Sequence, residues 1–211
     1  MDANGSGRPP ASRRDPHRRQ ALLDAADRVI CRDGPAASMA SIASEAGISK
    51  PILYRHFGDK SGLYQALAER HARTLIEALR AEFLRAGTLW DRACATIDTY
   101  LSTISANPNL YRFLVHRASA EDAATHSAVS TVIRGLGREL ADVMIAEGGM
   151  SDRVRAEVWG HSAVGMVHTA GDWWLDNPEV PRETVVDALA DLLRGGLRGG
   201  LLGDAARGAL P

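Results

Sequence analysis

The segment between Ser38 and Leu63 constrains the fold most strongly, because glycines interrupt its helical pattern at short intervals. Gly47 separates two stretches of helical periodicity, 39–46 and 50–57, and a second glycine ends the latter. A third stretch is long and runs over about 60–85. Two short helices joined by a tight turn and followed by a long helix are typical of a helix-turn-helix.

The residue types in this segment support that interpretation. Ser38 and Ser49 stand at N-cap positions ahead of the two short helices. Pro51 falls in the first turn of the second helix, where proline is tolerated. Ala43 and Gly47 are small enough to let the two helices cross closely. The second helix is then short and exposed enough to enter a DNA major groove about 12 Å wide.

The rest of the chain also has a helical pattern, and no strand-like alternation stands out. The first helix begins near Arg18 and ends at Asp33-Gly34-Pro35. Five further helices are predicted near 88–106, 109–119, 124–147, 151–176 and 181–200. The predicted fold class is all-α, with an N-terminal three-helix helix-turn-helix head on a larger helical body. Its predicted parts are a disordered basic arm (1–17), the head (18–64), the body (65–203) and a flexible tail (204–211).

The charge of the chain is unevenly distributed between its two parts. The net charge is −1, but residues 1–60 hold ten Lys/Arg and seven Asp/Glu, whereas residues 61–211 hold fifteen and nineteen. A head of charge +3 on a body of charge −4 suits a protein that presents one end to phosphates.

No apolar run spans a bilayer and no signal peptide is present, so we expect a cytoplasmic protein without a membrane partner. Cys31 and Cys94 lie far apart and are expected to be buried thiols.

Motifs of the common catalytic and metal sites are missing from the sequence. It contains no P-loop, GxSxG, HExxH or Cys/His zinc pattern. We therefore expect no catalytic residues, no metal and no cofactor. The alternative of a helical enzyme rests on His161, His168 and Asp172, which could share one helix face.

The run I-A-x-x-A-G-I-S-K-P-x-L-Y-x-H-F-x-x-K-x-x-L resembles the signature of the tetracycline-repressor (TetR) family of bacterial regulators. The resemblance covers about 18–70 and includes the upstream Leu-Leu-Asp-Ala-Ala run at 22–26. Ile30 and Pro35 stand where the family usually has aromatic residues. Ile52 replaces a small or hydroxyl residue that often contacts DNA in the family, so the operator sequence is not predicted.

The resemblance implies a set of DNA contacts. Ser38 and Ser49 would donate to phosphates at helix N-termini. Tyr54 and His56 would touch the DNA backbone, and Lys60 would hold a phosphate. The residues implied to face the groove are Lys50, Pro51, Ile52 and Arg55.

The lysine distribution supports this assignment independently, because the only two lysines, against 23 arginines, are Lys50 and Lys60. Structural alternatives remain open for three aromatic residues. Tyr54 and Phe57 could pack the head, and His56 could form a hydrogen bond inside it.

The arm is also open to two interpretations. Its arginines could be solvated or could follow a DNA groove, as homeodomain arms do.

The family resemblance further implies a homodimer in which the last two helices, 151–176 and 181–200, form a four-helix bundle with their partners. Gly160, Ala163 and Gly165 would allow close approach in the first of these helices. The alternative is that these surfaces only close the core of the monomer.

Apolar and aromatic residues along the body helices are candidates for an effector pocket, although core packing explains them equally well. Polar candidates are sparse, namely Arg112, His116, His161, His168 and Asp172, so a lipophilic effector is favoured. The candidate lining residues are Phe83, Trp90, Ile97, Tyr100, Leu101, Tyr111, Phe113, Leu114, Met144, Met166, Val167, Trp173 and Trp174.

The resulting expectation is a ligand-responsive repressor. It would bind a palindromic, double-stranded operator as a dimer and be released by a small hydrophobic effector such as a long-chain fatty acid or another lipophile. A ligand-independent or architectural DNA-binding protein is the alternative, and the sequence does not separate a repressor from an activator.

Overall fold

The computed structural model describes residues 16–118, 123–147 and 149–207. These residues form helices joined by short connections, and no strand occurs among them, which confirms the all-α prediction. The helices are α1 (Pro16–Asp33), α2 (Met39–Glu45), α3 (Lys50–Phe57), α4 (Lys60–Phe83), α5 (Leu89–Ala106), α6 (Pro108–Arg112), α8 (Ala123–Ala146), α9 (Arg153–Leu175) and α10 (Arg182–Arg207), with a short 3₁₀ turn η1 (Gly34–Ala36) and a π-helical segment η2 (Phe113–Ala118).

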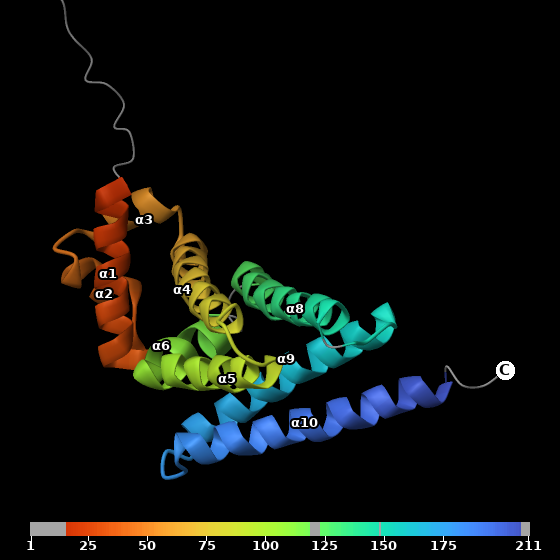
Figure 1. The fold of residues 1–211 in the computed structure, drawn as a ribbon. Coiled ribbons are helices and arrows are strands. Elements are labelled where there is room, and N and C mark those ends of the chain that lie inside the picture. Colours follow the sequence, from red (N-terminus) through yellow and green to blue (C-terminus); the bar gives the residue numbers. More distant parts are fainter. Residues whose placement is uncertain (1–15, 119–122, 148, 208–211) are drawn as a thin grey trace, which may run out of the picture.

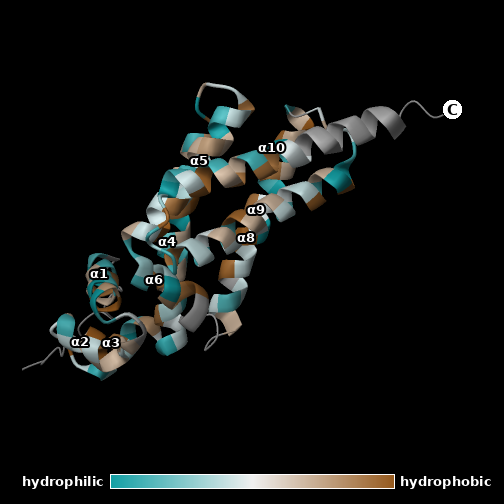
Figure 2. Cartoon of the chain, turned by 90° about the horizontal axis from the view of Figure 1, so that it is seen from below, coloured by the Kyte–Doolittle hydropathy of each residue, from teal (hydrophilic) through white to brown (hydrophobic). Residues whose placement is uncertain are grey.

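The molecule is a small helical head on a larger helical body (Figure 1). Helices α1, α2 and α3 form the head, and α4 leads from it into the body, where it contacts α5 and α8. Helix α8 packs along α9, and α10 lies against α5 and α9. Figure 2 shows the molecule from below with α1–α3 again at the end opposite α10. No described helix has the length and apolarity needed to cross a membrane.

The short helices of the head form where the chain caps them. Ser38 Oγ accepts from the Ser41 backbone N–H at 3.1 Å, and Ser41 Oγ accepts from the Ser38 N–H at 2.9 Å, a reciprocal capping box. Asp59 caps α4 by accepting from the Gly62 N–H at 2.7 Å. Gly47 adopts φ +64° in the turn between α2 and α3, a conformation that favours glycine.

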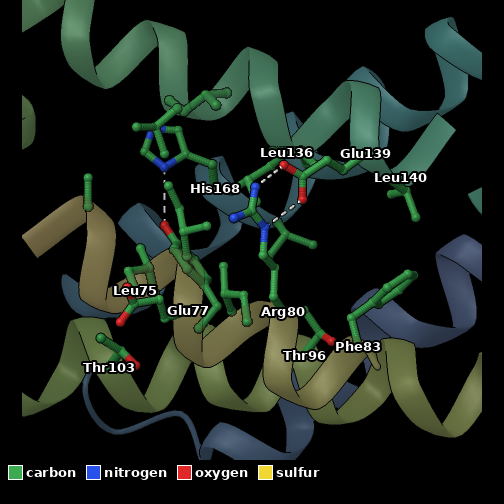
Figure 3. A pocket seen from close by; sticks show the side chains of 18 of the residues that line it. Leu75, Glu77, Arg80, Phe83, Thr96, Thr103, Leu136, Glu139, Leu140 and His168 are labelled. Carbon is green, nitrogen blue, oxygen red and sulfur yellow. Dashed lines mark hydrogen bonds and ion pairs between the residues drawn. The ribbon is translucent and has the colours of Figure 1, made fainter. Parts of the chain in front are cut away.

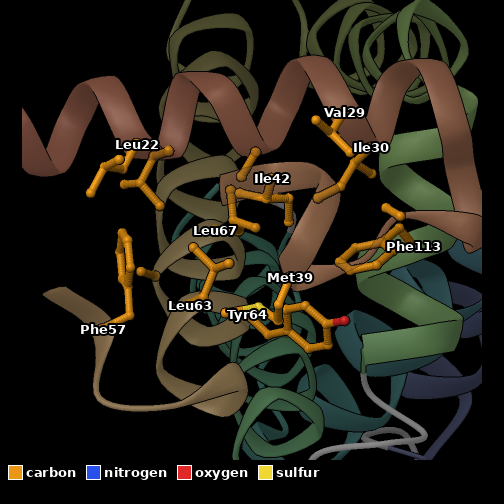
Figure 4. Packing of buried hydrophobic residues seen from close by; sticks show 14 of the residues in the cluster. Leu22, Val29, Ile30, Met39, Ile42, Phe57, Leu63, Tyr64, Leu67 and Phe113 are labelled. Carbon is orange, nitrogen blue, oxygen red and sulfur yellow. The ribbon is translucent and has the colours of Figure 1, made fainter. Parts of the chain in front are cut away.

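The core of the head is completed by the body. Leu22, Val29 and Ile30 of α1 pack with Ile42 of α2, and Leu63 and Leu67 lie below them (Figure 4). Leu53 belongs to the same cluster. Phe113 reaches into the same cluster from η2, where its ring meets that of Tyr64 edge-on at 4.9 Å. Because Phe113 is completely buried there, head and body share one hydrophobic core.

Helices α8 and α9 cross closely because both carry glycine at the crossing. A Cβ built on Gly160 would overlap the Gly137 carbonyl oxygen, and a Cβ built on Gly137 would overlap the His161 ring. Gly160 therefore serves the packing of the monomer and not an outward-facing surface. Gly165 of the same helix has no atom within 4 Å of a Cβ built on it.

Three boundaries differ from the sequence-based expectation. Helix α1 begins at Pro16, within the predicted arm, whose residues 1–15 lie outside the described part. The helix predicted at 109–119 is α6 followed by the wider π-helical turn η2. Helix α10 continues to Arg207, because its glycines lower helix propensity by only about 1 kcal/mol each and do not end the helix. The described part of the predicted flexible tail, 204–207, is thus helical, and 208–211 lie outside the described residues.

We predict that Gly160→Ala lowers the free energy of unfolding by about 1–3 kcal/mol, because the added methyl group forces α8 and α9 apart. The matched control is Gly135→Ala in α8, where a Cβ has no neighbour within 4 Å. That variant should be neutral or more stable by up to about 1 kcal/mol. Urea denaturation followed by circular dichroism measures both, and equal effects of the two substitutions would contradict this account of the helix crossing.

Candidate nucleic-acid interface and effector cavity

Helix α3 buries one face in the head and presents the other outward. Leu53 and Phe57 are buried in the head core. The nine predicted DNA-contacting residues all remain accessible, on α3 or at the N-termini of α2, α3 and α4. Ser38, Ser49, Lys50, Pro51, Arg55 and Lys60 are exposed, whereas Ile52, Tyr54 and His56 are partly exposed.

The cations of this surface, Lys50, Arg55 and Lys60, are arranged to meet an anion. Among the described residues, no carboxylate forms an ion pair with Lys50 or Arg55. Lys50 Nζ lies 5.7 Å from the centroid of the Tyr54 ring, and Lys60 Nζ lies 5.3 Å from that of Tyr64. The surface therefore offers positive charge beside the partly exposed ring of Tyr54.

For three aromatic residues of α3, the sequence left open whether the side chain contacts DNA or packs within the head. Phe57 packs in the core, with the Arg19 guanidinium 5.0 Å above its ring. Tyr54 does both things at once, because it packs against the core and remains partly exposed. No hydrogen bond is recorded for the partly exposed His56 ring within the described head. Arg28 and Arg32 of α1 form ion pairs with Glu45 of α2.

A large cavity of about 1690 Å³ lies in the body between α4, α5, α8 and α9. Its wall is mainly apolar, and α4 supplies Leu75, Leu79 and Phe83 from successive turns. Figure 3 shows Leu75 and Phe83 on α4. The structure brings eight of the thirteen predicted pocket residues to this wall. The eight are Phe83, Trp90, Ile97, Tyr100, Tyr111, Leu114, Met144 and Val167.

The other five predicted pocket residues do not line the cavity, and here the prediction is corrected. Leu101, Met166 and Trp174 pack in the cluster between α5, α9 and α10, and the Trp174 Nε1–H donates to the Val180 carbonyl at 2.8 Å. Phe113 is buried in the head core, as described above. Trp173 points outward and is 53% exposed.

Helix α8 supplies much of the wall that the sequence analysis missed. Leu136, Leu140 and Val143 follow one another at helical spacing on its inner face. The apolar residues of α4, with the exception of Phe83, were also missed. In both helices the three- and four-residue spacing was visible, but it did not show which helices would face each other across a space.

Charged groups also line the cavity, among them Arg73, Glu77 and Arg194. Arg80 of α4 pairs with Glu139 of α8 across the cavity, with Arg80 Nε 2.9 Å from Glu139 Oε2 (Figure 3). Elsewhere Tyr100, Tyr111 and His168 meet through contacts of 3.1 Å. Arg112 and Asp176 form a separate ion pair of 2.6 Å.

The two tyrosines are held as neutral phenols. Burial raises the pKa of Tyr100 to about 12. Burial also raises the pKa of Tyr111, with further contributions from Tyr100 and from Asp172, to which the Tyr111 hydroxyl donates at 2.7 Å.

The histidines proposed for an enzymatic alternative do not gather into a site. His161 is exposed and packs over Gly137, whereas His168 faces the cavity. Among the residues that the structure describes, no group of three His, Cys, Asp or Glu side chains could hold a metal ion. The side chain of His116 lies outside the described set. Cys31 and Cys94 are free, partly buried thiols, and burial raises the pKa of both.

Known proteins resemble both parts of the chain. Residues 22–67 match the model of bacterial regulatory proteins of the tetR family, and residues 74–207 match that of the tetracyclin repressor-like C-terminal domain. An HTH-type transcriptional regulator of Mycobacterium tuberculosis is 31% identical over 180 residues, which are 83% of this chain and 75% of the relative. The HTH-type transcriptional activator FasR of Mycolicibacterium smegmatis is 27% identical over 92% of this chain and 89% of the relative.

Solved structures share the fold. A tetR-family transcriptional regulator from Streptomyces coelicolor is 23% identical, with a TM-score of 0.74 over 92% of this chain and 86% of that one. The transcriptional regulator FadR from Bacillus subtilis, in complex with stearoyl-CoA, is 16% identical, with a TM-score of 0.62 over 82% of this chain and 96% of that one.

The helix-turn-helix head with its exposed α3, the all-helical body and the matches to both family models agree with one another. The chain belongs to the TetR family of bacterial transcriptional regulators.

Proposed function

We propose that this regulator is a repressor that binds a palindromic operator as a homodimer in the cytoplasm and is released by a small hydrophobic effector. The observation that carries the proposal is the course of α4. One end of this helix lies in the head core through Leu63 and Leu67, and the other end lines the cavity through Leu75, Leu79 and Phe83. A molecule in the cavity therefore touches the helix that positions the head.

The DNA-binding end is α3 with the helix N-termini around it. Lys50 and Arg55 are free of carboxylate partners in the described structure, so they can donate to base edges or phosphates without breaking an ion pair. Ser38, Ser49 and Lys60 would hold the flanking phosphates, and Tyr54 and His56 would touch the backbone. Pro51 and Ile52 would contribute apolar contacts in the groove.

The proposed dimer surface is the outer face of α9 and α10. Val154, Val158 and Trp173 of α9 are 70%, 60% and 53% exposed, and Leu192 of α10 is 63% exposed. The three α9 residues share one side of the helix at 3.6 residues per turn. Gly165 lies on that side with open space over it and would let a partner helix approach closely. Large exposed apolar side chains gathered on one surface are typical of an interface.

The proposed effector is a long apolar molecule, such as a long-chain fatty acid or ester. The cavity of about 1690 Å³ exceeds the range of roughly 300–1,000 Å³ that is common for drug-sized ligands. The fold relative FadR, in complex with stearoyl-CoA, makes a long acyl chain the first candidate.

Cavity and head are joined by a second connection through α6 and the π-helical segment η2. Leu110 and Leu114 line the cavity and also belong to the head core. The Asn109 Nδ2 donates to the Cys31 carbonyl of α1 at 2.9 Å. A change in the cavity wall at α6 would thus be felt by α1 and by the core beneath α3. Because coupling is reciprocal, DNA would weaken effector binding as much as the effector weakens DNA binding.

Substitutions on the DNA surface should have distinct effects. With fragments selected from the source genome, we expect Lys60→Ala to weaken binding to all sequences and to reduce the slope of log K against log salt by about 1. Arg55→Ala should cost about 1–3 kcal/mol and relax sequence preference. The control is Arg85→Ala beyond the far end of α4, which should leave affinity unchanged. Fluorescence anisotropy measures all three, and unchanged, equally salt-dependent binding by Lys60→Ala would refute the phosphate contact.

Introducing a charged side chain on α9 tests the proposed dimer surface. Val158→Glu and Trp173→Glu should shift the sedimentation behaviour from dimer to monomer and abolish tight operator binding, because a charge would be buried without a partner. Leu84→Glu is the matched control, since Leu84 is 78% exposed but lies at the end of α4. A dimer that survives both α9 substitutions would place the interface elsewhere.

Filling the cavity should separate effector binding from DNA binding. Ala93 and Ala95 lie on α5, but only Ala93 lines the large cavity. We expect Ala93→Phe to weaken effector binding about tenfold or more through overpacking, with operator affinity retained. Ala95→Phe should bind effector normally. Isothermal titration calorimetry with long-chain acyl probes makes the comparison, and equal affinities in the two variants would show that the effector binds outside this cavity.

A further inference from the structure

The ion pair between Arg80 and Glu139, which we name the clasp, joins two of the helices that enclose the cavity. Arg80 belongs to the last turn of α4, and Glu139 lies on α8. The guanidinium holds the carboxylate through two nitrogens, with Nε 2.9 Å from Oε2 and Nη2 bonded to Oε1 (Figure 3). Both residues line the cavity. A molecule that enters between α4 and α8 at this level must therefore pass the clasp or separate it.

Most other charged groups of the cavity wall cannot readily replace a member of the clasp. Asp142 lies one turn further along α8 but is itself paired with Arg153. Arg194 of α10 lies over the Trp90 ring, with its Cζ 4.0 Å from the ring centroid. Glu69 of α4 is about three helical turns away from the clasp.

Glu77 is the exception, because it offers Arg80 a second partner on the same helix. Glu77 stands three residues before Arg80, a spacing at which opposite charges on a helix interact. It is exposed, lines the cavity and forms no ion pair with any described residue. Arg73, four residues before Glu77, is the other cation of α4 at a suitable spacing, and it is not paired with Glu77 in the described structure. Arg80 can therefore exchange Glu139 for Glu77 and keep a carboxylate partner.

Such an exchange requires little free energy, because the clasp is not buried. The side chains of Arg80 and Glu139 are 54% and 46% exposed. Water and salt weaken ion pairs of this exposure, so that one pair changes an equilibrium by a factor of about two to five. A ligand can thus open the clasp with a small part of its own binding free energy.

We propose that the clasp is a two-position switch. Arg80 bonds to Glu139 in the operator-binding arrangement and turns to Glu77 when an effector separates α4 from α8. The closed clasp ties the far end of α4 to α8, which packs along α9 and its proposed dimer surface. Since Leu63 and Leu67 fix the other end of α4 in the head core, the closed clasp holds the head relative to the dimer surface.

This inference rests on the proposed function, because it takes an effector-released repressor as its starting point. It goes further by naming the contact that the effector breaks and the contact that replaces it.

Three glutamine substitutions test the clasp, with operator affinity measured by fluorescence anisotropy on fragments selected from the source genome. Without ligand, Glu139→Gln should weaken operator binding by about twofold to fivefold, because the clasp no longer closes. Glu77→Gln should leave it unchanged or slightly tighter, because only the open position is lost. The control is Glu82→Gln, which disrupts an ion pair of 2.6 Å with Arg85 outside the cavity wall and should have no effect. Each variant removes one negative charge, so a general effect of charge on DNA binding would change all three alike.

The open position is tested with methyl hexadecanoate, because the head of this probe carries no charge that could pair with Arg80. Release from the operator should require about twofold to fivefold more of the ester in Glu77→Gln than in the wild-type protein. A charge exchange gives a further check. Arg80→Glu alone should weaken operator binding, and its combination with Glu139→Arg should restore it, because the exchanged charges close the clasp again.

Two ligand-free results would overturn the clasp, namely equal operator affinity of Glu139→Gln and Glu82→Gln, or an equal loss in Glu139→Gln and Glu77→Gln. An unchanged ester requirement in Glu77→Gln would overturn the exchange between the two carboxylates. In each case the effector-released repressor stands if the ester releases the wild-type protein. If the ester does not release it, the proposed ester effector fails, and the ligand-free comparison still decides whether the clasp holds the head.

Discussion

The structure depends on one constraint, namely that helix α4 must satisfy two environments at its two ends. Its 24 residues span about 36 Å, enough to run from the head into the middle of the body. Leu63, Tyr64 and Leu67 are buried beneath the helix-turn-helix, so the head cannot turn without moving α4. The opposite end lines the large cavity through Leu75, Leu79 and Phe83. The cavity and the DNA-binding surface are therefore attached to one rigid element.

The shared core around Phe113 makes this attachment firmer. A head that packed only on itself could pivot freely on the Asp59 turn. Instead, Phe113 fills the head core from η2, and its ring meets Tyr64 of α4. Fully burying an aromatic ring of this size stabilises a fold by roughly 2–3 kcal/mol. Separating head from body would expose that surface, so the head is expected to move together with α4 and α6 rather than independently of them.

The head could be predicted from the sequence because its signals are local. Ser38, Gly47 and Asp59 set the ends of short helices through their own hydrogen bonds and backbone conformations, and the structure shows α3 at the predicted residues, Lys50–Phe57. The cavity could be predicted only in part because its signals are not local. Trp173 and Trp174 are neighbours of the same type, yet one is buried among α5 and α10 residues and the other points outward. The arrangement of the surrounding helices decides that difference, and local patterns in the sequence do not show this arrangement.

The central claim is that occupancy of the cavity and occupancy of the DNA surface oppose each other through α4 and α6. It is tested most directly by measuring operator affinity at increasing concentration of a long-chain acyl probe and, separately, the affinity for that probe at increasing operator concentration. The account predicts a loss of about 5- to 150-fold, equal in the two experiments, because the coupling free energy is a single quantity. Tight binding of both molecules to the same protein, with neither affinity changed by the other, would contradict it.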